Sequence, residues 1–434
     1  MKSSSIDKPI SVVMYIASFY PQPMGGMEMQ GLRLAHQLIN QGINVTIFTH
    51  GFKNCDKEEV YEGIRIIRLH SWLNRAFETI LSAKNRFISK NDAPDLPSSE
   101  RVKNGLPYDT SDTGIKINGN LADLVYYLIQ TFNFAWSLRK KCGQANIIHV
   151  HGVPWVSFVG VSVGRFYKIP VIVKESTTIG LKKYDDIIWG NRIRRYVLAH
   201  AHFVAISKYI YQVILKYGVP VKRVYYIPNG TTIPPKSAEE TINELNVLFV
   251  GNLTQGAAKG LDILLQAWVI VIEKYPDAKL LIAGNNDNPE SWLQYLTNLA
   301  IEKNVVFLGN KNKINEVFEQ TTIYVSPSRR EGLSNALLEA MAFGLPCIVT
   351  NISGSQDMIE HGVNGYIVEP DNTAELADSI LSLFSSKMLR KTMRQKSYAK
   401  VKTTCSFEMI IKEYQTIYYC MLNRVKNGNP SPKN

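Results

Sequence analysis

Two glutamates, Glu331 and Glu339, have the residue type and spacing that most strongly suggest chemistry. They stand eight positions apart between Ser326 and Thr350, the first in a loop after an expected strand and the second in the following helix. Ser334 between them is a good N-cap, so the first turn of that helix would direct unpaired N–H groups outward and favour a phosphate. A carboxylate in the loop can meet sugar hydroxyls, and one in the helix can accept hydrogen bonds from ribose hydroxyls.

The glycine that follows the first glutamate supports the same reading. Gly332 lets the backbone pass close to a ligand. The spacing E-x7-E alone is weak evidence, because two surface glutamates around an ordinary helix cap would also match it. Its place in a strand–loop–helix unit makes the pattern strong evidence for a ligand site.

A second candidate site is the segment Val250–Gly260, with the sequence VGNLTQGAAKG. An expected strand ends at Gly251, a glycine-bearing loop follows, and Lys259 stands where the next helix should begin. A lysine at that place can meet a diphosphate as a point charge. A solvated lysine is an equally good reading of the motif alone.

Two further candidates lie at strand ends nearer the N-terminus. Gly25 and Gly26 separate the first expected strand from the first helix and permit close approach to a phosphate or sugar. His151 ends the expected strand Ile147–His151, and ligands of open α/β sheets bind beyond the carboxyl ends of strands. A plain glycine turn and a satisfied polar histidine are the alternatives.

Some signatures are missing from the sequence. No Asp-x-Asp occurs, so we expect no bound metal; no GxxxxGK[ST] and no G-x-S-x-G occur, which argues against a P-loop NTPase and against a hydrolase with a nucleophile elbow. The five cysteines form no CxxC pair, which favours reduced structural thiols. No apolar run is long enough to span a membrane and the N-terminus lacks a leader pattern, so we expect a cytoplasmic protein.

Strands alternate with helices along the chain, which predicts parallel sheets covered on both faces. The expected strands of the first half are 10–16, 44–49, 63–69, 147–151, 170–174, 203–206 and 224–227. Those of the second half are 246–250, 279–283, 305–308, 323–325 and 347–349. Helices are expected at 27–40, 261–274 and 335–343 among others, and a long polar loop at 86–120.

The length of 434 residues predicts two domains. The Pro- and Gly-rich stretch at 229–243 is the expected linker, which gives domains 1–235 and 236–406, and the final helix, within 407–434, could return to the first domain. Through Pro235 the chain has 29 Lys and Arg against 16 Asp and Glu, a net charge of +13; the remainder has 20 against 21, a net charge of −1. This asymmetry predicts an anionic partner for the first half.

The ordered motifs resemble those of the family 4 retaining glycosyltransferases of GT-B fold. They are MGG, HVHG, IPNGT, VGNL…KG and EGLSNALLEAMAFGLP, and they cover nearly the whole chain. The resemblance implies two Rossmann-like, doubly wound domains that face each other across a cleft. It implies a donor held mainly by the second domain, an acceptor bound by the first, and retention of anomeric configuration without a metal.

The resemblance also implies roles for individual residues. Glu331 would contact the donor sugar, Glu339 the ribose, and Lys259 the leaving diphosphate; His151 would face the reacting sugar and acceptor. The other donor-binding candidates are Gly25, Gly26, Asn252, Gly332, Leu333, Ser334 and Asn335. The implied mechanism is front-face substitution, in which the leaving phosphate oxygen takes the acceptor proton and stabilisation of that leaving group carries most of the catalysis.

Two positions depart from the family pattern. Asn252 stands where the family usually has an arginine, and Arg329 or Arg330 could supply the missing cation. The segment after the strand that ends near Lys174 reads KESTT, where the family often has a histidine. Because that region faces the acceptor, the acceptor chemistry could differ.

The predicted activity is transfer of a sugar from a nucleotide-diphosphate sugar, a UDP-sugar somewhat favoured, to a hydroxyl of a glycan or lipid-linked acceptor in cell-surface polysaccharide or glycolipid synthesis, with no cofactor. Alternatives are an epimerase or phosphorylase of the same fold, a degenerate partner subunit, and a nucleic-acid binder; the last is disfavoured because no RNA-binding motif occurs. An anionic membrane surface is a further candidate partner, which would make the protein peripheral on the inner membrane face. The basic stretch Trp189–Leu198 is the expected contact, and an ordinary surface helix is its alternative.

Overall fold

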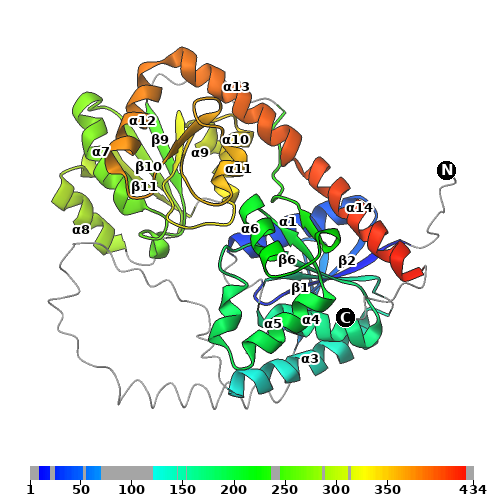
Figure 1. The fold of residues 1–434 in the computed structure, drawn as a ribbon. Helices are drawn as coiled ribbons and strands as arrows, with labels where there is room; N and C mark the ends of the chain where they lie inside the picture. The colour runs from blue at the N-terminus through cyan, green and yellow to red at the C-terminus, as the bar shows by residue number, and fades with distance from the viewer. Residues whose placement is uncertain are drawn as a thin grey trace, which may run out of the picture. The chain divides into compact units, whose positions relative to one another are not determined.

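The structure is a computed structural model of the full chain. It describes residues 9–19, 25–51, 55–69, 121–143, 145–152, 154–235, 245–285, 289–310 and 314–426. The described chain divides into two compact units (Figure 1). Unit 1 holds the residues up to Ile227 together with those from Ile410 onward, and unit 2 holds the residues from Pro228 to Met409. The long loop expected at 86–120 lies outside the described residues.

Unit 1 is built on an eight-stranded sheet in the order β3-β4-β2-β1-β5-β6-β7-β8. Its strands are β1 (Ser11–Ile16), β2 (Asn44–His50), β3 (Glu58–Tyr61), β4 (Ile64–Leu69), β5 (Ile147–His151), β6 (Val171–Glu175), β7 (His202–Ala205) and β8 (Val224–Tyr226). All neighbours pair in parallel except β3, which runs antiparallel to β4 at the edge. The central strands are apolar runs buried on both faces, as parallel strands require.

Helices cover both faces of this sheet. The helices of unit 1 are α1 (Gly26–Asn40), α3 (Leu121–Lys141), α4 (Trp155–Tyr167), α5 (Gly190–His200) and α6 (Lys208–Lys216), with short 3-10 turns η1 (Lys182–Asp186) and η2 (Val221–Arg223). On one face, Val12 and Met14 of β1 share a core with α1 and with Tyr414 and Tyr418 of the last helix, α14 (Phe407–Lys426). On the other face Tyr15 stacks on Phe134 of α3, with ring centroids 4.8 Å apart. The last helix therefore packs on unit 1.

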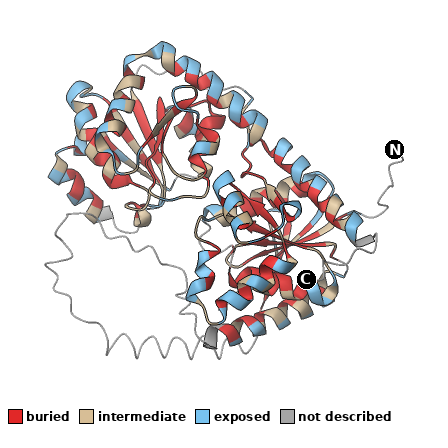
Figure 2. Cartoon of the chain, in the orientation of Figure 1, coloured by how far each residue is buried: buried red, intermediate tan, exposed pale blue. Residues whose placement is uncertain are grey.

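Unit 2 is built on a six-stranded parallel sheet in the order β11-β10-β9-β12-β13-β14. Its strands are β9 (Asn246–Val250), β10 (Lys279–Ala283), β11 (Val305–Gly309), β12 (Ile323–Ser326), β13 (Cys347–Thr350) and β14 (Gly365–Val368). Its helices are α7 (Leu261–Lys274), α8 (Pro289–Leu299), α9 (Ile314–Glu319), α10 (Asn335–Ala342), α11 (Ser355–Met358), α12 (Thr373–Ser385) and α13 (Lys387–Thr404), with 3-10 turns η3 (Leu253–Gln255) and η4 (Glu302–Asn304). Figure 2 shows the buried strands enclosed by helices whose outer sides are exposed.

The predicted α/β class with parallel sheets is confirmed in each unit. Two short strands were not predicted from the sequence: β3, at one edge of the sheet in unit 1, and β14, at one edge of the sheet in unit 2. No helix in the part of the chain that the structure describes is long and apolar enough to cross a bilayer.

Candidate functional site

Unit 2 brings two of the predicted site segments into direct contact. The loop after β9 carries Lys259, and the loop after β12 carries Glu331; the Lys259 ammonium donates to the Glu331 carboxylate in an ion pair. Both side chains are mostly buried, with 25% of Lys259 and 15% of Glu331 exposed. A lysine and a glutamate predicted from separate motifs therefore meet at the carboxyl end of the sheet.

A glycine allows these two loops to approach. Gly260, the N-cap of α7, has φ +72°, and a Cβ there would come within 1.9 Å of the Pro327 carbonyl oxygen. A side chain at this position would push the loops apart, so the glycine that follows Lys259 has a packing reason. Lys259 itself precedes α7 in a turn and does not open the helix.

The helix after Glu331 begins as the sequence predicts. Ser334 is the N-cap of α10, and its hydroxyl accepts a hydrogen bond from the Leu337 backbone N–H at 3.3 Å. Leu333 is buried, and the backbone of Gly332 lies against Gly354, which has φ +77°. The Asn335 side-chain oxygen accepts from Asn229 at 2.8 Å. The first turn of α10 is therefore held firmly on its loop.

Glu339 lies in the second turn of α10 and is half-buried. Asn252 is exposed, and its side-chain oxygen accepts from the Thr254 backbone N–H at 3.0 Å as the cap of η3. This amide therefore has a local capping role. The structure joins Asn252 to neither the Lys259 ion pair nor α10 by a hydrogen bond within the described residues.

The two arginines that could replace the missing cation have different environments. The Arg329 guanidinium donates to both oxygens of Asp262 at 2.8 and 2.7 Å, to Asp371 at 2.7 Å, and to the Ala257 carbonyl. Its hydrogen bonds to the Asp262 carboxylate raise the pKa of Arg329. Arg330 is exposed and forms no ion pair with a residue in the described ranges. The geometry therefore gives Arg329 a structural role and leaves Arg330 available to a ligand.

In unit 1, the glycines before α1 meet a carboxylate of their own chain. Gly25 is the N-cap of α1, and the Glu28 carboxylate lies at that helix start, where the backbone N–H groups of Gly25 and Glu28 bond to it. Burial raises the pKa of Glu28. A phosphate at Gly25 and Gly26 would compete with this carboxylate for the same donors.

His151 ends β5 in a buried polar cluster. It is 1% exposed, neither ring nitrogen has a hydrogen-bond partner among the described residues, and its ring lies 4.5 Å from that of His149. His149 bonds to the Tyr418 hydroxyl at 2.8 Å. Burial, with help from His149 and Lys174, lowers the pKa of His151 well below its usual value, so the ring is neutral. A neutral, unpartnered imidazole can donate one hydrogen bond and accept another.

Two titratable residues at the end of β6, the strand next to β5, were not predicted as site residues. Lys174 pairs in register with His151, and burial lowers its pKa to about 8. Glu175 is 2% exposed; one carboxylate oxygen accepts from the Thr177 backbone N–H at 2.9 Å, the other has no partner among the described residues, and burial raises its pKa to about 7. The sequence signal that could have identified them is a lysine followed by a glutamate at the carboxyl end of an otherwise apolar strand.

The stretch Trp189–Leu198 forms α5 and the residue before it. Its apolar side packs inward: Ile193, Val197 and Leu198 are buried. Arg194 donates to Asp185 at 2.6 Å and lies over the Tyr217 ring. Most of the apolar side predicted to face a membrane is therefore covered by unit 1, and Trp189, which is 58% exposed, precedes the helix. The sequence alone could not distinguish a buried side from a free one.

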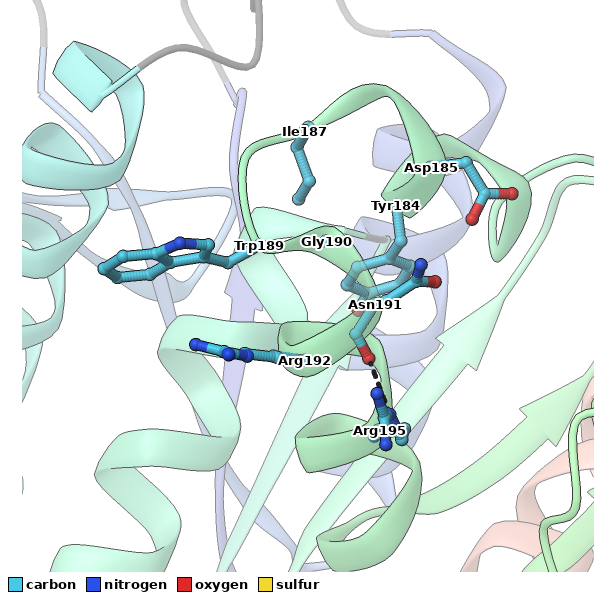
Figure 3. Close-up of a pocket in the computed structure, with 8 residues that line it drawn as sticks. All are labelled: Tyr184, Asp185, Ile187, Trp189, Gly190, Asn191, Arg192 and Arg195. Carbon is cyan, nitrogen blue, oxygen red and sulfur yellow. Dashed lines mark hydrogen bonds between the residues drawn. The ribbon is translucent and has the colours of Figure 1, made fainter.

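The start of α5 lines a pocket of about 380 Å³. Figure 3 shows Trp189 and Arg192 on one side of it and Tyr184 and Asn191 on the other, with Arg195 donating to the Asn191 carbonyl. Its lining mixes acidic and basic side chains, with Asp185 among them, so it has no single-sign charge that would select a ligand.

Comparisons with known proteins agree on one family. Residues 97–233 match the family described as Glycosyltransferase Family 4, and residues 244–386 match Glycosyl transferases group 1. The chain is 30% identical over 328 residues to the spore coat protein SA of Bacillus subtilis, a match covering 64% of this chain and 86% of that protein.

Two further relatives match over shorter segments. The chain is 32% identical over 209 residues to the N-acetyl-alpha-D-glucosaminyl L-malate synthase of Bacillus anthracis, covering 48% of this chain. It is 29% identical over 178 residues to the capsular polysaccharide biosynthesis glycosyltransferase CapM of Staphylococcus aureus, covering 40% of this chain. The matches span about half the length of these two relatives, 53% and 46%.

Solved structures share the fold. Sucrose-phosphate synthase from Thermosynechococcus elongatus has a TM-score of 0.69 and 17% identity, with 95% of this chain and 99% of that chain covered. Anabaena Alr3699/HepE in complex with UDP and glucose has a TM-score of 0.65 and 16% identity, with 94% and 99% covered. At such identities the likeness establishes the GT-B fold alone.

Proposed function

The chain belongs to the family 4, or group 1, glycosyltransferases, and from that premise we propose that it moves a sugar from a nucleotide-diphosphate sugar to a hydroxyl group of a glycan or lipid-linked acceptor. We propose further that the anomeric configuration is retained and that no metal takes part. Several relatives are named as sugar transferases, CapM among them, so a free epimerase or phosphorylase activity is not favoured.

The ion pair between Lys259 and Glu331 is the observation that carries the proposal. It sets a cation and a hydrogen-bond acceptor side by side, next to the capped start of α10. When a nucleotide sugar binds, the diphosphate would take over the Lys259 ammonium, and the sugar hydroxyls would donate to the released Glu331 carboxylate. The ion pair therefore keeps both groups oriented before the donor arrives.

The proposed reaction breaks the bond between the anomeric carbon and the phosphate oxygen while the acceptor oxygen bonds to the same carbon. The acceptor proton passes to the leaving phosphate oxygen, so both groups lie on one face of the sugar. Negative charge grows on the diphosphate as it leaves, and Lys259 with the backbone N–H groups of α10 would stabilise it. Arg330 would supply a further cation in place of the arginine that Asn252 replaces. The absence of Asp-x-Asp supports a mechanism in which these groups, and no metal, neutralise the diphosphate.

The acceptor side is proposed for unit 1. His151 and Glu175 each keep buried polar atoms without a partner among the described residues, and such groups are paired in most folded proteins. Acceptor hydroxyls could pair with them. Glu175 stands within the KESTT segment, where the family often has a histidine, so this chain would recognise its acceptor with a carboxyl group.

A UDP-sugar is the proposed donor. Support comes from the structural neighbour HepE, which was solved in complex with UDP and glucose. The relative CapM, named for capsular polysaccharide biosynthesis, supports a glycan acceptor in a cell-surface polymer.

The test is product analysis after incubation with a panel of nucleotide sugars and a cell lipid and glycan extract. Mass spectrometry should find an acceptor heavier by one sugar, and release of nucleotide should depend on the extract. The Lys259→Met variant should lose transfer, whereas Lys274→Met, an exposed lysine at the end of α7, should retain it. Nucleotide release without any extract, together with an altered free sugar, would instead identify an epimerase.

A further inference from the structure

Helix α3 exposes a continuous apolar row on its outer side. The row, called here the α3 patch, consists of Val125, Leu128, Phe132 and Trp136, which are 41%, 50%, 69% and 62% exposed. Spacings of three and four residues place these side chains on one side of a helix. Single exposed apolar residues are ordinary, but an aligned row of this size marks an interaction surface.

The side of α3 opposite the α3 patch forms the part of the helix that belongs to the core of unit 1. Tyr127, Phe134 and Leu138 are buried on the opposite side of the helix, where Phe134 stacks on Tyr15 of β1 and Tyr127 stacks on Trp155 of α4. No charged residue occurs from Leu124 to Leu138, so the helix is apolar or neutral all the way round while one side lies in solvent. A helix of that kind normally has both sides covered. Helix α4 contacts it on one flank, where the Tyr167 hydroxyl donates to the Ala135 carbonyl at 3.0 Å (Figure 1).

Cations flank the patch. Arg139 and Lys140 are exposed at the end of α3. Arg165 and Lys168 are exposed at the end of α4, on either side of Phe166, which is 74% exposed. The carboxylate near this end of α3, Glu58, is already paired with Lys141 and Arg65. At the C-terminal ends of α3 and α4, the described charged side chains that form no ion pair are therefore positive, in agreement with the net charge of +13 in the first half of the chain.

We propose that the α3 patch docks unit 1 on an anionic lipid bilayer. Aromatic and aliphatic side chains in a row, with lysines and arginines at the rim, suit a helix that lies in the membrane interface. The positive charge at the C-terminal ends of α3 and α4 fits an anionic lipid surface better than a second copy of the chain, which would bring the same positive charges into contact. The membrane contact thus lies on α3 and not on α5, whose apolar side is buried.

Flotation of the full chain with lipid vesicles tests the proposal. No donor or acceptor is added, so the outcome does not depend on the proposed activity. Binding should require phosphatidylglycerol mixed into phosphatidylcholine and should weaken as salt rises. Replacement of Phe132 and Trp136 by serine should weaken binding by roughly 30-fold or more, because two interface-buried side chains are lost. Leu293→Ser with Met388→Ser, which changes two exposed apolar residues of unit 2, is the matched control and should bind as the wild type does.

Quenching by brominated lipid locates the contact. Trp136→Phe keeps an apolar ring, so it should still bind but lose most of the tryptophan quenching; Trp189→Phe, at the exposed residue before α5, should keep the quenching. Absence of wild-type binding to either vesicle, unchanged binding of the Phe132 and Trp136 serine variant, or quenching lost only with Trp189→Phe would overturn the proposal. A dimer in sedimentation that this serine variant dissociates, without vesicle binding, would assign the patch to a second copy instead.

Discussion

Two adjacent arginines in the loop before α10 should respond in opposite ways to the same substitution. Arg329→Met removes both hydrogen bonds to Asp262, whose side chain is 2% exposed, and the bond to Asp371. Leaving a buried carboxylate unpaired costs about 3–5 kcal/mol. Because Arg329 is itself 31% exposed and water could reach part of the site, we expect about 2–4 kcal/mol of lost stability.

That loss should appear as a fall in melting temperature of roughly 5–15 °C, since about 1 kcal/mol shifts a domain of this size by 2–4 °C. Arg330→Met should leave the melting temperature nearly unchanged, because a surface substitution changes stability by less than about 0.5 kcal/mol. It should raise the KM for the nucleotide sugar by roughly tenfold or more, since one charged hydrogen bond to the diphosphate is worth about 1.5–3 kcal/mol.

Thermal melts by circular dichroism measure the stability of both variants. Donor titrations on the same preparations measure the KM for the nucleotide sugar. The double variant Arg329→Met with Asp262→Leu should regain part of the stability, because no buried charge is then left alone. An unchanged melting temperature for Arg329→Met, or an equal fall for both single variants, would refute the structural role of Arg329.

Three further predictions concern the proposed site. Glu331→Ala should mainly lower kcat and Glu339→Ala should mainly raise the donor KM, as steady-state kinetics would measure. Each change should correspond to a free energy of about 1.5–3 kcal/mol. Wild-type kinetics in both variants would show that the donor site lies elsewhere. Activity should survive EDTA in a coupled nucleotide-release assay, and loss that Mn²⁺ or Mg²⁺ restores would contradict a metal-free mechanism. Burial raises the pKa of Glu175 from 4.5 to about 7, so the folded state binds the proton more tightly and wild-type stability should fall as the pH rises from 4.5 to 7, by up to about 3 kcal/mol more than in Glu175→Gln. Urea unfolding at pH 5 and pH 7.5 should show this difference, and parallel pH profiles for the two proteins would count against the buried carboxyl.

Sequence patterns located the central strands well. Ile147–His151, Asn246–Val250 and Lys279–Ala283 have the predicted bounds, because strands buried on both faces are unbroken apolar runs. The missed strands Glu58–Tyr61 and Gly365–Val368 are four residues each and lie at sheet edges. Neither strand is an unbroken run of buried residues. Such short edge segments carry too little pattern to be separated from turns.

Pattern and spacing also placed the cap at Ser334 and pointed to Lys259 and Glu331, but could not show that those two side chains pair across 72 positions of chain. Neighbouring residues such as Arg329 and Arg330 have different environments, and only the fold decides which one a buried Asp262 engages. The same limit explains the membrane contact predicted at Trp189–Leu198. Helical period reveals an apolar side but not whether the protein already covers it, as it does on α5 and does not on α3.

The anomeric configuration of the product is the most direct test of the central claim. Proton NMR of the wild-type reaction, with EDTA present and with the donor identified in the panel, would follow the new anomeric signal as it forms. Transfer from an α-linked nucleotide sugar should give an α-linked product from the first time point, and the signal should be lost in Lys259→Met. A β-linked initial product, or hydrolysis to free sugar without a linked acceptor, would contradict a retaining transferase that uses the site of unit 2.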